Sequence, residues 1–179
     1  MRYAASYLRN SVAHSLIGPA SSHSTAQEAG TRATILRFAQ DGLNPGDNSS
    51  RMDPLLETAF AARQHAHAPY SGFLVGAAIE CEDGRIFGGC NIESSSYGLT
   101  CCAERTAAFA AIAAGARKFR RIAIATDAAR ITPPCGACRQ VLWDLCGDIE
   151  ILLGNAQGDT RTFQLHDLFP DPFDADSLA

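Results

Sequence analysis

Three cysteines and one glutamate lie at the predicted starts of two helices, in positions that suit a metal site. Cys102 is followed two residues later by Glu104, and Cys135 and Cys138 form a C-x-x-C pair directly after Pro134. Zinc prefers thiolate ligands, and the C-x-x-C spacing lets one turn present two sulfurs to a single ion. Helix starts also favour thiolate over thiol. The sequence therefore predicts a zinc ion (Zn²⁺) held by Cys102, Cys135 and Cys138.

Three protein ligands indicate a catalytic zinc site, because a structural site is closed by four. Cys101 and Cys146 are the other candidates for a fourth ligand. Cys101 is adjacent to Cys102, and adjacent residues seldom reach one ion from a helix start. Cys146 lies about 12 Å from Cys138 at the helical rise. Glu104 can reach a water without binding the metal, take its proton and pass it to a leaving amine. We therefore expect an open, water-activating site.

Two arginines directly follow residues of this set: Arg105 follows Glu104, and Arg139 follows Cys138. Three thiolates outweigh the charge of one zinc ion, which would make the metal a poor acid for its water. We hypothesise that both guanidinium groups hydrogen-bond the ligand sulfurs and offset this negative charge. The alternative is two ordinary surface arginines.

The elements that would position these residues alternate between helix and strand after an initial hairpin. Asp53 is a candidate N-cap and Pro54 a first-turn residue for a helix that ends before Pro69. Residues 74–79 and 85–90 predict two strands around a turn at 82–84. The other expected elements are a helix at 102–114, a strand at 121–126, a helix at 135–145, and strands at 149–153 and 161–163. This order predicts a mixed sheet covered by helices, in the α/β class.

Composition narrows the class of protein. The chain has 179 residues, 46% of them hydrophobic, which suits one globular domain. Its net charge of −4 does not suggest polycationic binding to nucleic acid. No apolar run approaches the ~20 residues that span a bilayer, so no membrane association is expected. An odd count of 7 cysteines without a recognisable secretory signal argues for a reducing cytoplasm rather than a disulfide framework.

Residues 1–51 differ from the rest of the chain. They are rich in small and hydroxyl-bearing residues and end in a run of turn formers. We expect a mostly disordered extension here, with a short helix possible at 31–40. Met52 then begins a plausible helix, so a misassigned start, with the natural start near Met52, is the alternative. The expected domain is 52–179.

Four segments resemble the small homo-tetrameric cytidine deaminases: 68–78, 91–99, 102–107 and 134–140. The resemblance extends over about residues 53–175, without large gaps. It implies a three-layer α/β/α sandwich around a mixed five-stranded sheet. It also implies one zinc ion per subunit, a homotetramer with shared active sites, and hydrolytic deamination of cytidine and deoxycytidine to uridine and deoxyuridine in pyrimidine salvage. In zinc deaminases water attacks C4 of the pyrimidine with a glutamate as acid and base, and Glu104 matches that glutamate.

The same resemblance implies the substrate contacts. Asn91 and Glu93 match residues that bind the ribose 3′-hydroxyl, for which an amide and a carboxylate are suitable partners. Phe73 matches a residue that packs near the nucleoside, and the backbone of Ala103 matches the part that reads the pyrimidine edge. Phe173 resembles a C-terminal phenylalanine that stacks on the base from a neighbouring subunit. For Phe73 a core aromatic position is the alternative.

Three other functions remain to be weighed. A related deaminase could act on a blasticidin-type antibiotic nucleoside or a free base, but Asn91 and Glu93 favour an ordinary nucleoside with a 3′-hydroxyl. A polynucleotide-editing deaminase would need a basic groove with interleaved aromatics, which an acidic domain does not offer. A non-catalytic zinc-stabilised binding module would not need Glu104.

Overall fold

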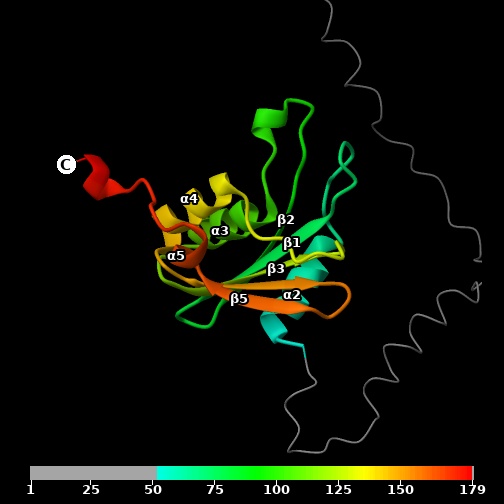
Figure 1. The fold of residues 1–179 in the computed structure, drawn as a ribbon, viewed down its shortest axis with the longest axis horizontal. Helices are drawn as coiled ribbons and strands as arrows, with labels where there is room; N and C mark the ends of the chain where they lie inside the picture. The colour runs from blue at the N-terminus through cyan, green and yellow to red at the C-terminus, as the bar shows by residue number, and fades with distance from the viewer. Residues whose placement is uncertain (1–51, 179) are drawn as a thin grey trace, which may run out of the picture. The chain divides into compact units, whose positions relative to one another are not determined.

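The computed structural model describes residues 52–178, in which a five-stranded mixed sheet forms the central layer (Figure 1). The strand order is β2-β1-β3-β4-β5. Only the β3–β4 pair is parallel, and the other neighbouring pairs are antiparallel. The strands are β1 (Val75–Cys81), β2 (Ile86–Cys90), β3 (Phe119–Thr126), β4 (Glu150–Asn155) and β5 (Thr160–Gln164). The expectations for residues 1–51 lie outside the described residues.

Helices cover both faces of the sheet, which confirms the three-layer sandwich. Side chains of a strand alternate between faces, and β1 shows this directly. Ala78 packs with Leu55 and Leu56 of one helix, whereas Ala77 and Ile79 belong to the core on the other face. The helices are α2 (Pro54–Arg63), α3 (Ala103–Ala113), α4 (Gly136–Cys146) and α5 (Leu165–Leu168), with 3₁₀ turns η1 (Tyr97–Leu99) and η2 (Ala175–Leu178). No helix in this part of the chain has the length and apolar character needed to cross a membrane.

Two glycines let the helices approach the sheet closely. A Cβ on Gly76 of β1 would lie 2.0 Å from Ala59 O of α2, and a Cβ on Gly89 of β2 would lie 2.3 Å from Ala107 N of α3. Any side chain at these positions would collide with helix backbone. The absence of a side chain at Gly89 therefore fixes the height of α3, the helix that carries Glu104, above the sheet.

The connection from β3 through α4 to β4 places the start of α4 at the carboxyl end of the sheet. β3 and β4 are parallel neighbours, so the helix between them runs back across the sheet face. The loop before α4 thus leaves from the carboxyl end of β3, where ligands commonly bind in α/β sheets. Cys135 and Cys138 lie at the start of this helix.

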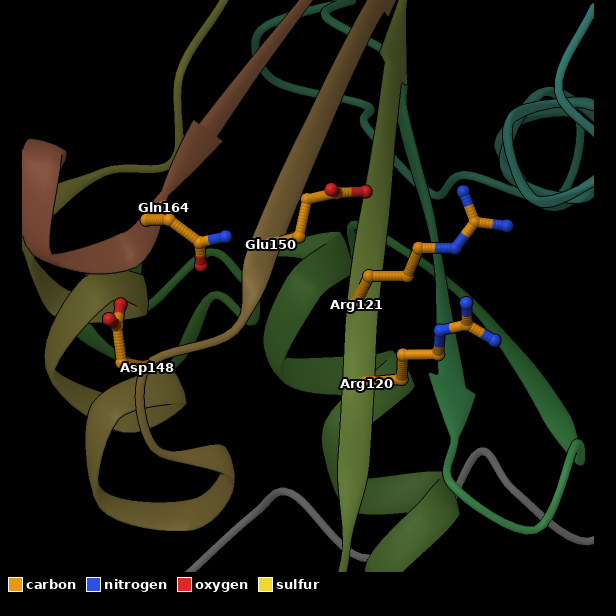
Figure 2. A pocket seen from close by; sticks show the side chains of 5 residues that line it. All are labelled: Arg120, Arg121, Asp148, Glu150 and Gln164. Atoms are coloured by element: carbon orange, nitrogen blue, oxygen red, sulfur yellow. The ribbon is translucent and has the colours of Figure 1, made fainter.

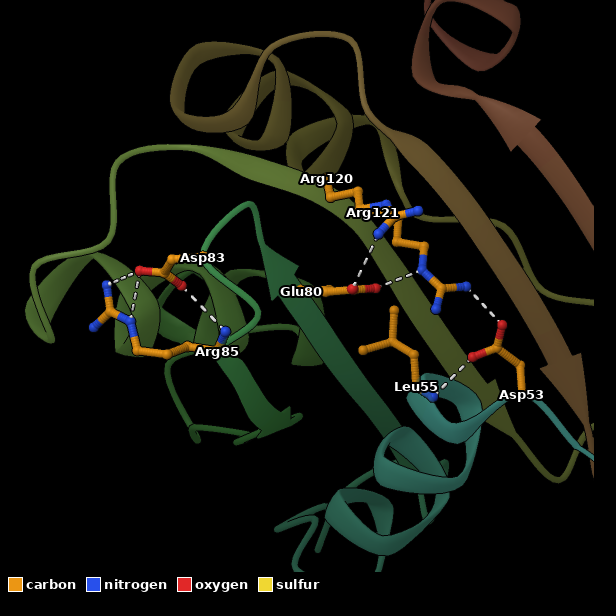
Figure 3. A network of polar contacts seen from close by, with 7 residues as sticks. All are labelled: Asp53, Leu55, Glu80, Asp83, Arg85, Arg120 and Arg121. Atoms are coloured by element: carbon orange, nitrogen blue, oxygen red, sulfur yellow. Dashed lines mark hydrogen bonds and ion pairs between the residues drawn. The ribbon is translucent and has the colours of Figure 1, made fainter.

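Charged side chains gather at the opposite, amino ends of β3 and β4. A surface hollow of about 440 Å³ is lined there by residues of β3, β4, β5 and the loop before β4 (Figure 2): Arg120, Arg121, Asp148, Glu150 and Gln164. Figure 3 shows that Arg121 bridges the layers. Its NH1 donates to Asp53 Oδ2 and its Nε to Glu80 Oε2, both over 2.6 Å.

Candidate active site

The three predicted sulfur ligands meet at the starts of α3 and α4. Cys102 and Cys135 are the N-cap residues of these helices, and neither uses its side chain to cap the helix. The sulfurs of Cys102, Cys135 and Cys138 all lie within 4.8 Å of one another, and Cys102 Sγ is 3.9 Å from Cys135 Sγ. Tetrahedral zinc with bonds of about 2.3 Å separates its sulfur ligands by about 3.8 Å. The donor type and the spacing therefore fit one zinc ion.

The environment of the cluster favours ionised sulfur at Cys102. Hydrogen bonding from the Cys138 thiol, together with the Arg105 guanidinium, lowers the pKa of Cys102 to about 5. The same Cys102–Cys138 contact, with burial, raises the pKa of Cys138 above its usual range. One thiolate thus shares the proton of its neighbour. A zinc ion bound here would displace the remaining thiol protons, because the metal binds cysteine in its deprotonated form.

Glu104 lies in the first turn of α3 and is 4% exposed. Burial raises the pKa of its carboxyl group to about 7, and the charge of Cys102 adds to the shift. The Glu104 carboxylate also contributes to the raised pKa of Cys138, which places it beside the sulfur cluster. A buried carboxyl at this position can hold or release a proton next to a bound water.

The two arginines have different partners. Arg105 NH2 donates to Thr100 O over 2.7 Å and to Cys102 Sγ over 3.7 Å. Arg139 instead donates from Nε to Pro134 O over 2.8 Å and from NH1 to Leu168 O over 2.5 Å. A bond from Arg139 to a sulfur is therefore not among the contacts of residues 52–178, in contrast to the expectation, because backbone carbonyls hold its guanidinium.

Asn91 and Glu93 follow β2 and hold the turn before β1. Glu93 accepts hydrogen bonds from Tyr70 N, Ser71 N and Ser71 Oγ. These bonds, led by that from the Ser71 hydroxyl, lower the pKa of the Glu93 carboxyl group. The buried Asn91 donates from Nδ2 to Phe73 O over 2.8 Å. The structure thus brings together three of the predicted substrate residues.

Ala103 and Phe173 lie on different parts of the molecule. Ala103 is the buried first residue of α3, where backbone N–H groups lack intrahelical partners. Phe173 is 58% exposed on the C-terminal segment, which leaves the helical layer in Figure 1. Gln140 Nε2 of α4 donates to Phe173 O over 2.6 Å and so ties this segment to the helix that carries Cys138.

Three polar residues of the site were not assigned roles from the sequence: Ser71, Thr100 and Gln140. Ser71 and Gln140 lie inside segments that had been singled out, but their partners are distant in sequence. Ser71 bonds Glu93 across 22 positions and Gln140 bonds Phe173 across 33. Thr100 accepts from Arg105 through its backbone carbonyl and from Ser94 N through its hydroxyl. The one available signal was that Ser71 is a turn-forming residue within a segment that carries the family resemblance.

Comparison with known proteins identifies the family. Residues 49–151 match the model of the cytidine and deoxycytidylate deaminase zinc-binding region. Cytidine deaminase from Halalkalibacterium halodurans is 48% identical over 125 residues, covering 69% of this chain and 95% of that protein. The chain belongs to the cytidine deaminase family. The matched zinc-binding region contains Cys102, Cys135 and Cys138, so the family and the sulfur geometry agree on a zinc ion in the subunit.

Solved cytidine deaminases share the fold. The crystal structure of the Burkholderia pseudomallei enzyme is 50% identical with a TM-score of 0.66, covering 68% of this chain and all of that one. The Mycobacterium tuberculosis structure is 39% identical with a TM-score of 0.59, covering 67% of this chain and 94% of that one. These matches confirm the mixed-sheet α/β architecture expected from the sequence.

Proposed function

We propose that this protein catalyses the hydrolytic deamination of cytidine and deoxycytidine, giving uridine or deoxyuridine and ammonia. The observation that carries the proposal is the juxtaposition of a zinc-type sulfur cluster with the buried Glu104 at the start of α3. A structural zinc site is closed by four ligands and needs no buried carboxyl beside them. Family membership and named relatives support the same substrate class.

Different residues of the chain carry out the separate parts of the reaction. Cys102, Cys135 and Cys138 would hold the zinc ion, which would supply the Lewis acidity that lowers the pKa of a water. Glu104 takes a proton from the attacking water and delivers it to the exocyclic amine as the C4–N bond breaks. The first backbone N–H groups of α3, beginning at Ala103, read the pyrimidine edge. Asn91 and Glu93 bind the ribose 3′-hydroxyl, and Phe73 packs against the nucleoside.

Purified zinc-loaded protein tests the proposal. We expect cytidine and deoxycytidine to lose the cytosine absorbance band with stoichiometric release of ammonia. Glu104→Gln should retain zinc and lose about 10²–10⁴-fold in kcat, the usual contribution of a general acid–base group. Turnover of a blasticidin-type nucleoside or a single-stranded polynucleotide, with neither cytidine nor deoxycytidine consumed, would overturn the assignment.

We also propose a homotetramer in which Phe173 reaches the active site of a neighbouring subunit. Large exposed apolar side chains support this assembly: Tyr97 and Leu99 are each 75% exposed in the single chain. Stacking on a base contributes about 1 kcal/mol or somewhat more. Phe173→Ala should therefore raise KM with little change in zinc content. An unchanged KM would remove Phe173 from the site, and sedimentation would test the tetramer.

The catalytic domain is proposed to be residues 52–179, because every candidate site residue lies in this range. A chain beginning at Met52 should then match the full chain in kcat/KM. A cytoplasmic role in pyrimidine salvage fits the seven cysteines, all of which are free thiols in the structure. Localisation of a tagged chain would test this placement.

A further inference from the structure

The Glu93 carboxylate has most of its hydrogen-bonding capacity occupied by one turn. Tyr70 N and Ser71 N donate to Oε2 over 2.9 and 3.1 Å. Ser71 Oγ donates to Oε1 over 2.5 Å. An ionised carboxylate offers about four lone-pair directions. Three are therefore taken within residues 52–178, and one direction on Oε1 is left for a ligand.

The Asn91 side chain likewise has most of its hydrogen-bonding capacity occupied. Val75 N donates to its Oδ1 over 2.9 Å, which fixes the orientation of the amide. Its Nδ2 donates one hydrogen to Phe73 O. An amide nitrogen carries two hydrogens, so one donor is left by the contacts of the described chain. Asn91 and Glu93 are two positions apart in an extended segment, which directs their side chains to the same side.

The Ser71 hydroxyl connects these groups into a closed set of contacts. It donates to Glu93 Oε1 and accepts from Phe73 N over 3.0 Å. Phe73 O in turn accepts from Asn91. Because the backbone N–H of Phe73 occupies an acceptor direction of Ser71 Oγ, the hydroxyl hydrogen is directed at the carboxylate. Ser71 thereby holds both the rotation of Glu93 and the backbone of Phe73.

We propose that Ser71 is a positioning residue that makes the site require a sugar hydroxyl. The inference rests on the proposed function, in which Asn91 and Glu93 bind the 3′-hydroxyl of the nucleoside. A hydroxyl can donate and accept at once, so it satisfies the remaining acceptor of Glu93 and the remaining donor of Asn91 together. A sugar without this hydroxyl leaves both groups without this partner, and the loss is costly at Asn91, because Asn91 is buried.

Removing the Ser71 hydroxyl should weaken this requirement. Oε1 of Glu93 then has two free lone-pair directions, and the carboxylate loses the contact that fixes its rotation. The bound hydroxyl is consequently held less well, while water can satisfy the carboxylate when the hydroxyl is absent. The effect acts on sugar binding and leaves the reacting end of the nucleoside, at Glu104, unchanged.

Steady-state kinetics of the zinc-loaded full chain with deoxycytidine and 2′,3′-dideoxycytidine test this. Ser71→Ala should raise KM for deoxycytidine about tenfold, the change expected for one lost hydrogen bond, and change kcat much less. The kcat/KM ratio between the two nucleosides should fall by a similar factor. Ser71→Thr, which keeps a hydroxyl, should restore both values. Ser95→Ala is the matched control, because Ser95 is an exposed serine outside this set of contacts.

Two results would overturn the proposal. One is a KM and a nucleoside ratio in Ser71→Ala equal to those of the wild-type protein. The other is an equal loss of kcat on both substrates, which would indicate general damage to the fold. If Ser71→Ala does not fold, Ser71→Cys provides the same comparison. Failure of the wild-type protein to deaminate either nucleoside would instead overturn the proposed function, so the two failures are distinguishable.

Discussion

Arg105 and Arg139 each directly follow a residue of the predicted zinc site in the sequence. In the structure their guanidinium groups contact different atoms. Arg105 donates to the sulfur of Cys102, whereas Arg139 donates to the carbonyls of Pro134 and Leu168. A donor to a ligand sulfur delocalises negative charge away from the metal site. The two guanidinium groups are therefore expected to affect zinc binding unequally.

Zinc competition with a chromophoric chelator can measure this difference. Arg105→Gln should weaken zinc binding about 10–100-fold, as is usual when a partner of a metal ligand is removed. Arg139→Gln should weaken it less and should mainly loosen the C-terminal segment, seen as faster proteolysis after Leu168. Equal losses of zinc affinity in the two variants would contradict the distinction.

The contact between α3 and β2 sets the position of Glu104 at the level of secondary structure. Gly89 permits this contact, because a Cβ there would collide with the backbone of Ala107. Gly88, its neighbour on the other face of β2, has more room: a Cβ would lie 3.4 Å from Ala62 Cβ. One strand thus offers a test position and a matched control.

Gly89→Ala should destabilise the protein by about 1–3 kcal/mol or more, the cost of forcing backbone apart in a packed core. It should also lower zinc retention, because a displaced α3 carries Cys102 away from the other two sulfurs. Gly88→Ala should be close to neutral in both measurements. Urea unfolding and the zinc content of the purified variants would show this. If Gly89→Ala lost stability but kept its full zinc content, the packing of α3 on β2 would not control the zinc site.

The sequence predicted those features of the elements that depend on local spacing. A C-x-x-C pair after a proline indicates both a helix start and two ligands, and the structure has Cys135 as the N-cap of α4. The partners of Ser71 and Arg139 could not be predicted in this way. Glu93 and Leu168 reach them only after the sheet has formed, because they come from segments 22 and 29 positions away. Such contacts depend on tertiary placement, which periodicity does not encode.

Within the described residues, ion pairs join α2 to the sheet at the end remote from Cys102, Cys135 and Cys138. Asp53 Oδ1 accepts from Leu55 N over 2.8 Å as the N-cap of α2, and its Oδ2 pairs with Arg121 of β3 (Figure 3). Arg121 also pairs with Glu80 of β1. A single carboxylate therefore both starts the helix of one layer and ties it to the central sheet.

The stability that the ion pair between Asp53 and Arg121 contributes should depend on pH, because it requires the charged form of Asp53. Burial alone would raise the pKa of the Asp53 carboxyl group, but the hydrogen bonds from Arg121 and Leu55 N outweigh it and lower the pKa. A lowered folded-state pKa gives a stabilisation that is present above the unfolded value of about 3.9. That stabilisation is lost as the pH falls through the lowered pKa.

Asp53→Asn separates the charge from the cap, because asparagine is also a good N-cap. At pH 7 it should lower the free energy of unfolding by about 0.5–1 kcal/mol, a value suited to a partly exposed ion pair. The difference from the wild-type protein should shrink toward zero as the pH falls below the lowered pKa, where Asp53 itself becomes protonated. Asp53→Ala should lose about 1 kcal/mol more through the cap, independently of pH. Urea unfolding at a fixed protein concentration over this pH range measures both differences. An Asp53→Asn difference that stays constant with pH would show that the carboxylate acts only as a cap, leaving Glu80 as the partner that fixes Arg121.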